Sequence, residues 1–126
     1  MSAPASSISD SELDVLKVLW KRGQATVRDV NDALRKRKRR WAYNTVATLL
    51  ARLREKGFVE SEKQGVALVF RAKVSRDKLL RRRLTELADR VCDGTAGPLV
   101  HALIEGRKFT ADEIDDLRRM IDELDQ

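Results

Sequence analysis

The sequence predicts a mainly α-helical protein with a small β hairpin, in which an N-terminal winged helix-turn-helix is followed by a C-terminal helical dimerisation region. Up to Gly57, three stretches place apolar residues at helical spacing. The next stretch, FVESEKQGVALVFRA, changes to an extended pattern around a glycine, and helical spacing returns from Ser75. Three short helices and then a hairpin are the order of elements in a winged helix, whose second and third helices form the helix-turn-helix.

Capping signals delimit the first two helices. Ser9 with Glu12 forms a predicted capping box for a helix over about 9–22. Thr26 with Asp29 repeats the pattern and starts a second helix of about ten residues.

The third helix is expected over 43–56, because its apolar residues recur at helical spacing up to a glycine. Two short strands should follow, over 58–63 and 67–72, joined by a turn at Gln64-Gly65.

Three further helices are predicted after Ser75, the second beginning at Pro98 and the third with a capping box of Thr110 and Glu113. A segment of this size rarely stabilises itself. It must pack on the first domain, on another protein or on a second copy, and we favour self-association because a winged helix already closes its own core. The residues expected in the dimer contact are Leu80, Leu84, Leu87, Val91, Leu99, Leu103, Ile114, Leu117 and Ile121.

The chain of 126 residues is therefore expected to consist of a flexible tail over 1–8, a winged-helix DNA-binding domain over 9–74 and a helical dimerisation domain over 75–126. Its charge follows the same division. Residues 1–74 hold 16 Lys and Arg against 8 Asp and Glu, whereas residues 75–126 hold 10 against 12. A basic domain joined to a slightly acidic one indicates a phosphate-binding module followed by a part with another role.

The third helix is the candidate reading element. With Val46 at the centre of its buried stripe, the helical wheel places Asn44 and Thr48 on the opposite side and Thr45 at the edge. Asn can pair with adenine through two hydrogen bonds, and Thr can contact a base or place its methyl against thymine. Asn44, Thr45 and Thr48 are thus the predicted base contacts, although Asn44 and Thr45 could instead simply cap the helix.

Six consecutive cations, RKRKRR, lie directly before that helix. A charge run is often only a solvated loop, but this one adjoins a candidate reading helix, and each phosphate that it neutralised would release counterions. The predicted phosphate contacts are Arg37, Lys38, Arg39, Arg40, Tyr43, Arg52, Arg54 and, from the wing, Lys63. Trp41 is expected to be partly buried.

An enzyme finds little support in the sequence. His101 is the only histidine and Cys92 the only cysteine, and they lie nine positions apart across a Gly/Pro break. We expect no catalytic residue, no cofactor and no metal site, with His101 on a helix surface or in packing and Cys92 as a buried small hydrophobe. The sequence lacks an apolar run long enough for a membrane span, and its first residues lack a signal-peptide pattern, so we expect a cytoplasmic protein.

Several motifs together resemble the BlaI/MecI family of bacterial winged-helix transcriptional repressors. They are LDVLKVLWKRG, TVRDVNDAL, WAYNTVATLLARLREKGFV, VSRDKLL, LADRVCDGTAGPLVHALIE and FTADEIDDLRRMIDEL. The resemblance implies a homodimeric repressor that binds a palindromic operator in double-stranded DNA, with residues matching Thr45, Thr48 and Arg52 on the recognition helix.

The resemblance also implies a membrane sensor-protease as a further partner, since the best-known members are released from DNA when they are cut at an Asn-Phe bond. This chain has Ala102-Leu103 at that position. A copper-sensing branch with paired cysteines does not fit a chain with Cys92 alone.

The same fold also allows two other functions. One is a ligand-sensing winged-helix regulator whose effector binds between the domains, and a thermal shift with small molecules would favour it. The other is a winged helix used as a protein-interaction module, which the basic charge of the first domain argues against.

Overall fold

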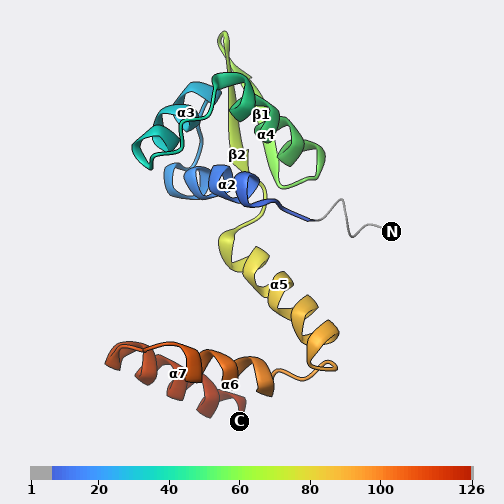
Figure 1. Cartoon of the computed structure of the whole chain (residues 1–126), viewed down its shortest axis with the longest axis vertical. Helices are drawn as coiled ribbons and strands as arrows, with labels where there is room; N and C mark the ends of the chain where they lie inside the picture. Colours follow the sequence, from blue (N-terminus) through green and yellow to red (C-terminus); the bar gives the residue numbers. More distant parts are fainter. Residues whose placement is uncertain (1–6, 126) are drawn as a thin grey trace. The chain divides into compact units, whose positions relative to one another are not determined.

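A computed structural model describes residues 7–125, so most of the predicted tail over 1–8 lies outside the described residues. The chain forms two compact units that divide between Leu80 and Arg81. The first contains three helices and a hairpin, followed by the start of a fourth helix (Figure 1). These elements are α2 (Asp10–Arg22), α3 (Val27–Lys36), α4 (Tyr43–Glu55), β1 (Val59–Gln64), β2 (Ala67–Ala72) and the beginning of α5 (Arg76–Val91). The predicted fold class, mainly α with a small β hairpin, is confirmed.

Reciprocal capping boxes start α2 and α3 at the predicted residues. The Ser9 hydroxyl accepts from the N–H of Glu12 at 3.1 Å, and the Glu12 carboxylate accepts from the N–H of Ser9 at 2.9 Å. Thr26 and Asp29 exchange the same two hydrogen bonds, both at 3.1 Å. Each box satisfies N–H groups that have no partner within the helix.

The hairpin pairs Gln64 with Ala67, so its two-residue loop is Gly65-Val66 and not the predicted Gln64-Gly65. The backbone explains the shift. Gly65 has a φ of +66°, whereas Val66 is not among the residues with positive φ. A type II′ turn needs glycine at its first central position, and Gly65 can occupy that position at little cost. A further bridge joins Ala25 to Phe70 through two backbone hydrogen bonds.

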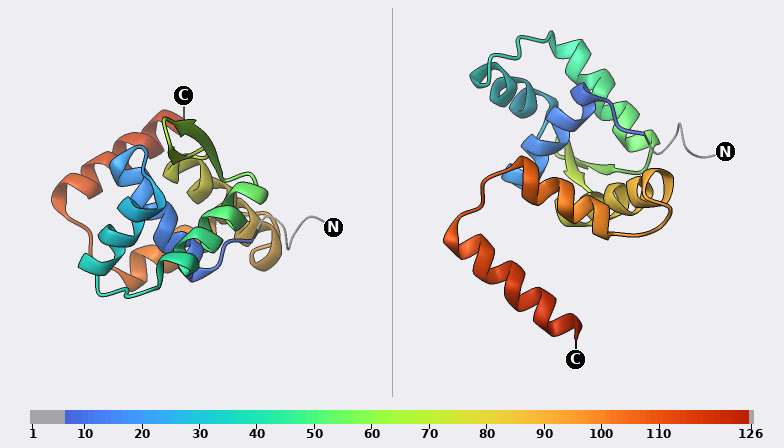
Figure 2. Two further views of the ribbon diagram at one scale, coloured as in Figure 1. Left: turned by 90° about the horizontal axis from the view of Figure 1, so that it is seen from above. Right: turned by 60° about the horizontal axis from the view of Figure 1, so that its bottom comes forward.

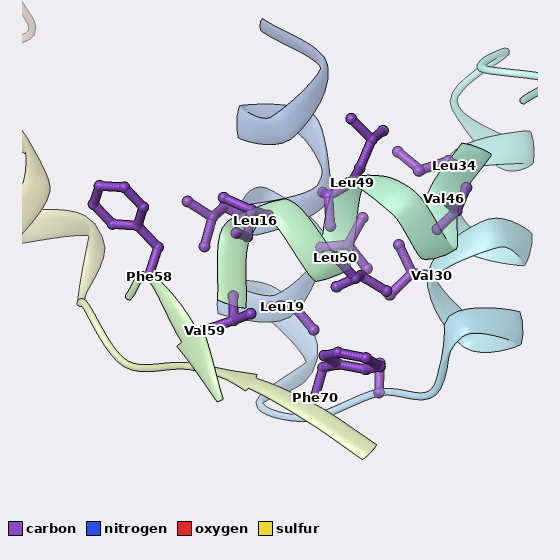
Figure 3. Close-up of a cluster of buried hydrophobic side chains, with 14 of the residues drawn as sticks. Leu16, Leu19, Val30, Leu34, Val46, Leu49, Leu50, Phe58, Val59 and Phe70 are labelled. Atoms are coloured by element: carbon purple, nitrogen blue, oxygen red, sulfur yellow. The ribbon is translucent and has the colours of Figure 1, made fainter. Parts of the chain in front are cut away.

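One apolar cluster holds the first unit together (Figure 3). It is built where the inner faces of α2, α3 and α4 meet the hairpin, and it includes Leu16, Leu50 and Phe70. Val74 and Leu79 also belong to it, so the compact unit extends beyond the limit of residue 74 expected from the sequence. The indole N–H of Trp20 donates to the Val74 carbonyl at 2.9 Å and anchors this extension.

The second unit contains the remainder of α5, α6 (Gly97–Gly106) and α7 (Ala111–Leu124), which Figure 2 shows in two further views. The predicted capping box of Thr110 and Glu113 is present. Pro98 follows Gly97, which is the first residue of α6, so the predicted start is one residue late. No residue of α6 or α7 is buried. Among the described residues, no helix is long and apolar enough to cross a bilayer.

Candidate nucleic-acid interface

The side of α4 opposite the core is exposed and uncharged over its first turns. Val46, Leu49, Leu50 and Leu53 are buried. The opposite side presents four exposed residues, here called the reading face: Asn44, Thr45, Thr48 and Ala51. The amphipathic pattern predicted Asn44 and Thr48 opposite the core and placed Thr45 at the edge.

The start of α4 shows whether Asn44 and Thr45 cap the helix, which was the alternative to a role in base contacts. The N-cap position is Ala42, which provides no side-chain hydrogen bond, so neither residue caps the helix. The Asn44 side chain has no hydrogen-bond partner among residues 7–125. The Thr48 hydroxyl donates to the Asn44 carbonyl at 2.9 Å, and its oxygen can still accept from a ligand. These side chains are therefore available to a partner outside the first unit.

The cation run forms the end of α3 and the turn that follows; residues 35–40 are here called the basic turn. Lys38 adopts a left-handed conformation with a φ of +65°. Its N–H donates to the Arg35 carbonyl at 3.0 Å, and the N–H of Arg39 donates to the Leu34 carbonyl at 2.9 Å. This is a Schellman motif, which usually has glycine at the left-handed position. It ends α3 sharply and turns the chain toward α4.

Arg39 and Arg54, two of the residues expected to bind phosphate, also contact other side chains of the protein. Arg39 contacts the Asp14 carboxylate at 3.1 Å, and its guanidinium lies 5.6 Å from the centre of the Trp41 ring. Arg54 donates to the Ser61 hydroxyl at 2.8 Å and lies over Phe70. Both side chains thus help to fix the elements around α4, while no ion pair within the described residues involves Arg37, Lys38 or Arg40.

Asn31 is buried on α3, and its side-chain amide donates to the Trp41 carbonyl at 2.9 Å. This bond connects α3 to the last residues before α4 and so fixes the geometry of the helix-turn-helix. Trp41 is partly buried, as predicted. Sequence reasoning missed Asn31, although its position one turn after Val27 on the apolar side of α3 could have indicated it.

A second missed interaction connects α2 to the end of α4. Glu12 is almost completely buried, and its carboxylate contacts the Lys56 ammonium at 2.7 Å. Burial raises the pKa of the Glu12 carboxyl, but hydrogen bonds from Lys56 and from the N–H of Ser9 outweigh this effect and hold the pKa below its usual range. The sequence indicated Glu12 only as a capping residue.

The wing offers little charge to a partner. Lys63 is exposed near its tip, where Gly65 and Val66 form the loop. Arg71 on β2 contacts Glu60 at 2.7 Å and Glu62 at 3.1 Å, so its charge is already balanced.

The remaining predicted residues of note are exposed or half-buried. His101 is exposed on α6, in agreement with the predicted surface position. Cys92 is only partly exposed and not buried as expected, because it follows the last residue of α5, where the chain turns. Within the part of the chain that the structure describes, no group of His, Cys, Asp or Glu could hold a metal ion.

Three helices closed by a hairpin, with a reading face on the third helix beside a basic turn, define a winged helix-turn-helix protein. A sequence profile of the penicillinase repressor family matches residues 8–123. The chain belongs to this family, the BlaI/MecI group of transcriptional repressors, which are not enzymes.

Curated relatives match over nearly the whole chain. The transcriptional regulator BlaI of Mycobacterium tuberculosis is 33% identical over 126 residues, covering 98% of this chain and 88% of that protein. The penicillinase repressor of Bacillus licheniformis is 28% identical over 116 residues, covering 92% of this chain and 90% of that protein. The methicillin resistance regulatory protein MecI of Staphylococcus aureus is 25% identical over 114 residues, covering 90% of this chain and 92% of that protein.

Solved structures resemble the first unit in particular. The DNA-binding domain of the repressor BlaI aligns with a TM-score of 0.52 at 32% identity, over 59% of this chain and 89% of that chain. The monomeric form of Bacillus licheniformis BlaI, in complex with the blaP half-operator, aligns with a TM-score of 0.50 at 33% identity, over 57% of this chain and 87% of that chain. A mutant MarR from E. coli in complex with operator DNA, at 16% identity and a TM-score of 0.51 over 94% of this chain and 76% of that chain, supports the fold alone.

Proposed function

We propose that this chain is a transcriptional repressor that acts in the cytoplasm and binds a palindromic operator as a homodimer, with α4 in the major groove. The observation that carries the proposal is the uncharged reading face beside the basic turn. A major groove admits an α-helix, and its base edges are read by small polar and apolar side chains. The related BlaI in complex with a half-operator supports the same partner.

The reading face supplies the base contacts in this proposal. The side-chain amide of Asn44, which has no partner among the described residues, can pair with adenine. Thr48 turns its hydroxyl proton toward the Asn44 carbonyl, so it would accept a hydrogen bond from a base or place its methyl against thymine. Thr45 is exposed one turn before Thr48 on the same helix and completes the set of proposed base contacts.

Phosphate contacts fix the position of α4 without reading sequence. Within the basic turn, Arg37, Lys38 and Arg40 have charges that no carboxylate of the described residues balances. Arg39 and Arg54 have protein partners and would position the turn and wing as well as contact DNA. The full proposed set is Arg37, Lys38, Arg39, Arg40, Tyr43, Arg52, Arg54 and Lys63.

The homodimer rests on the exposed apolar side chains of the second unit. Leu103 is 48% exposed and Leu117 is 38% exposed, although large apolar side chains are normally buried. A two-fold dimer would cover these faces and present two copies of α4 to half-sites about one or two helical turns apart. The proposed contact comprises Leu80 at the end of the first unit and, from the second, Leu84, Leu87, Val91, Leu99, Leu103, Ile114, Leu117 and Ile121. A membrane sensor-protease stays a prediction of the family resemblance, and Ala102-Leu103 lies within α6.

The substitution Thr48→Ala tests the reading role. Thr48 is exposed in the middle of a helix and alanine is a better helix former, so the fold should persist. We expect the preference for operator over random DNA to fall by about 1 kcal/mol, with little change in affinity for random DNA. Competition gel shifts with both DNAs measure this difference.

The matched control is Arg40→Gln, which removes a cation from the basic turn. It should weaken binding to operator and random DNA alike and reduce the slope of log affinity against log salt by about 1. If Thr48→Ala weakens both DNAs equally, the base-reading role of Thr48 is wrong.

A further inference from the structure

A cleft on the first unit lies apart from the reading face. It has a volume of about 650 Å³, and its lining comes from α2, the turn after α3 and the first turn of α5, with no residue of α4 or the hairpin. Small-molecule sites typically occupy about 300–1,000 Å³. The cleft is therefore large enough for a small organic ligand.

Four cations line this cleft: Lys17, Lys21, Arg37 and Arg76. All four are exposed, and the ion pairs of the described residues include none of them. Asp77 is the one carboxylate in the lining, so the cleft keeps a local excess of positive charge. Such an arrangement is unfavourable when empty, because Lys17 and Lys21 repel each other one helical turn apart, and an anion would relieve the repulsion.

The rest of the lining adds a flat apolar surface and a helix start. The indole of Trp20 is partly buried and its N–H is fixed on the Val74 carbonyl, so the ring is held in one orientation. Ser75 caps α5, since its hydroxyl accepts from the N–H of Lys78 at 3.1 Å. The first N–H groups of such a helix have no partner within it and favour an anion.

We propose that this cleft binds a small planar organic anion, with its phosphate or carboxylate among Lys17, Lys21, Arg37 and Arg76 and its apolar body against Trp20. Arg37 also belongs to the basic turn. A ligand in the cleft would compete with DNA phosphates for this side chain, so the site is suited to an effector that lowers DNA affinity.

Phenyl phosphate is the probe for this site, titrated into the ¹⁵N-labelled full chain at low ionic strength. The chain has two tryptophans, and only Trp20 lines the cleft. We expect the indole resonance of Trp20 to shift saturably while that of Trp41 stays constant, with a Trp41→Phe variant assigning the two signals. Inorganic phosphate should bind at least about tenfold more weakly, because it lacks the apolar body.

The double variant Lys21→Gln/Arg76→Gln should weaken phenyl phosphate binding at least about tenfold. Its control, Arg28→Gln/Lys73→Gln, makes the same change of charge at exposed residues outside the cleft and should change affinity less than about threefold. Absence of a saturable Trp20 shift, equal losses in the two double variants, or equal affinity for both phosphates would overturn the proposal.

A gel shift without ligand distinguishes this site from a contact for the DNA backbone. The Lys21→Gln/Arg76→Gln variant should keep the DNA affinity of the Arg28→Gln/Lys73→Gln control. A selective loss of DNA affinity would instead make the cleft a phosphate contact of DNA and overturn the effector site. Because DNA binding by the unmodified chain is measured in the same experiment, failure of the proposed repressor function would be seen separately.

Discussion

Glu12 has two roles, as a helix cap and as the partner of Lys56, and only the first can be predicted from the local sequence. Its capping role depends on a residue three positions away, so the pattern alone predicted it. Its ion pair with Lys56 depends on how α2 packs against the end of α4, which the local pattern does not specify. The same applies to Asn31 and Asp14, whose partners are ten or more positions distant along the chain.

The substitution Glu12→Gln should destabilise the first unit by about 1–3 kcal/mol at neutral pH, because it leaves the Lys56 ammonium without its counter-charge and weakens the cap. The folded state lowers the pKa of Glu12. Its stabilisation is therefore fully present above the unfolded pKa of about 4.3 and is lost as the pH falls through the lower folded pKa.

Urea unfolding of the full chain at fixed concentration, at pH 7 and near pH 2.5, measures this dependence. The difference between Glu12→Gln and the unmodified chain should shrink toward zero at the lower pH. Glu55→Gln, at an exposed residue of α4, serves as the control and should change little at either pH. A pH-independent loss in Glu12→Gln would show that the ion pair does not contribute.

Among the elements, the boundaries of α2, α3 and α4 follow from capping and periodicity, and these were predicted to within about one residue. The hairpin loop was displaced by one residue, because the prediction placed glycine second in the loop whereas the turn needs it first. The exposure of this side of α4 was predicted because one amphipathic stripe fixes its opposite side, and its base-reading role stays a prediction. The contacts of Arg39 and Arg54 with other protein residues could not be predicted, since their partners lie on other elements.

Because Lys38 in the basic turn has a left-handed backbone, we expect its replacement by glycine to raise the stability of the fold and to lower the affinity for DNA. Glycine adopts this conformation without the steric cost that a side chain incurs, so Lys38→Gly should stabilise the fold by about 0.5–1 kcal/mol. It should also weaken DNA binding, because one cation is lost. Thermal unfolding and gel shifts measure the two effects, and Lys36→Gly, within α3, should instead destabilise the fold.

For the whole molecule, the sequence indicated two parts with different roles, but it placed their boundary at residue 74. The compact first unit continues to Leu80, since Val74 and Leu79 are buried in its core. The second unit has apolar faces on α6 and α7 with no buried residue, which agrees with the expectation that this segment cannot close a core alone.

A charge placed on one of these faces should prevent the proposed self-association. Leu117→Lys would put an ammonium in the predicted dimer contact, where it would be desolvated without a partner. We expect sedimentation equilibrium to show a monomer and operator affinity to fall well over tenfold, because one half-site is then bound at a time. Val66→Lys makes the same kind of change at the fully exposed wing tip and should leave the dimer intact. A dimeric Leu117→Lys variant would place the contact elsewhere.

In the proposed homodimer, the unburied faces of α6 and α7 would make the amount of protein in the cell a variable of regulation. If folding of the second unit and pairing of protomers are one equilibrium, dilution lowers both the folded fraction of the second unit and the occupancy of the operator. Repression would then respond steeply to copy number, and slower synthesis or faster degradation alone would suffice to turn the regulated genes on. Protomers left without a partner would also be the first to reach the cell's proteases, which would sharpen that response.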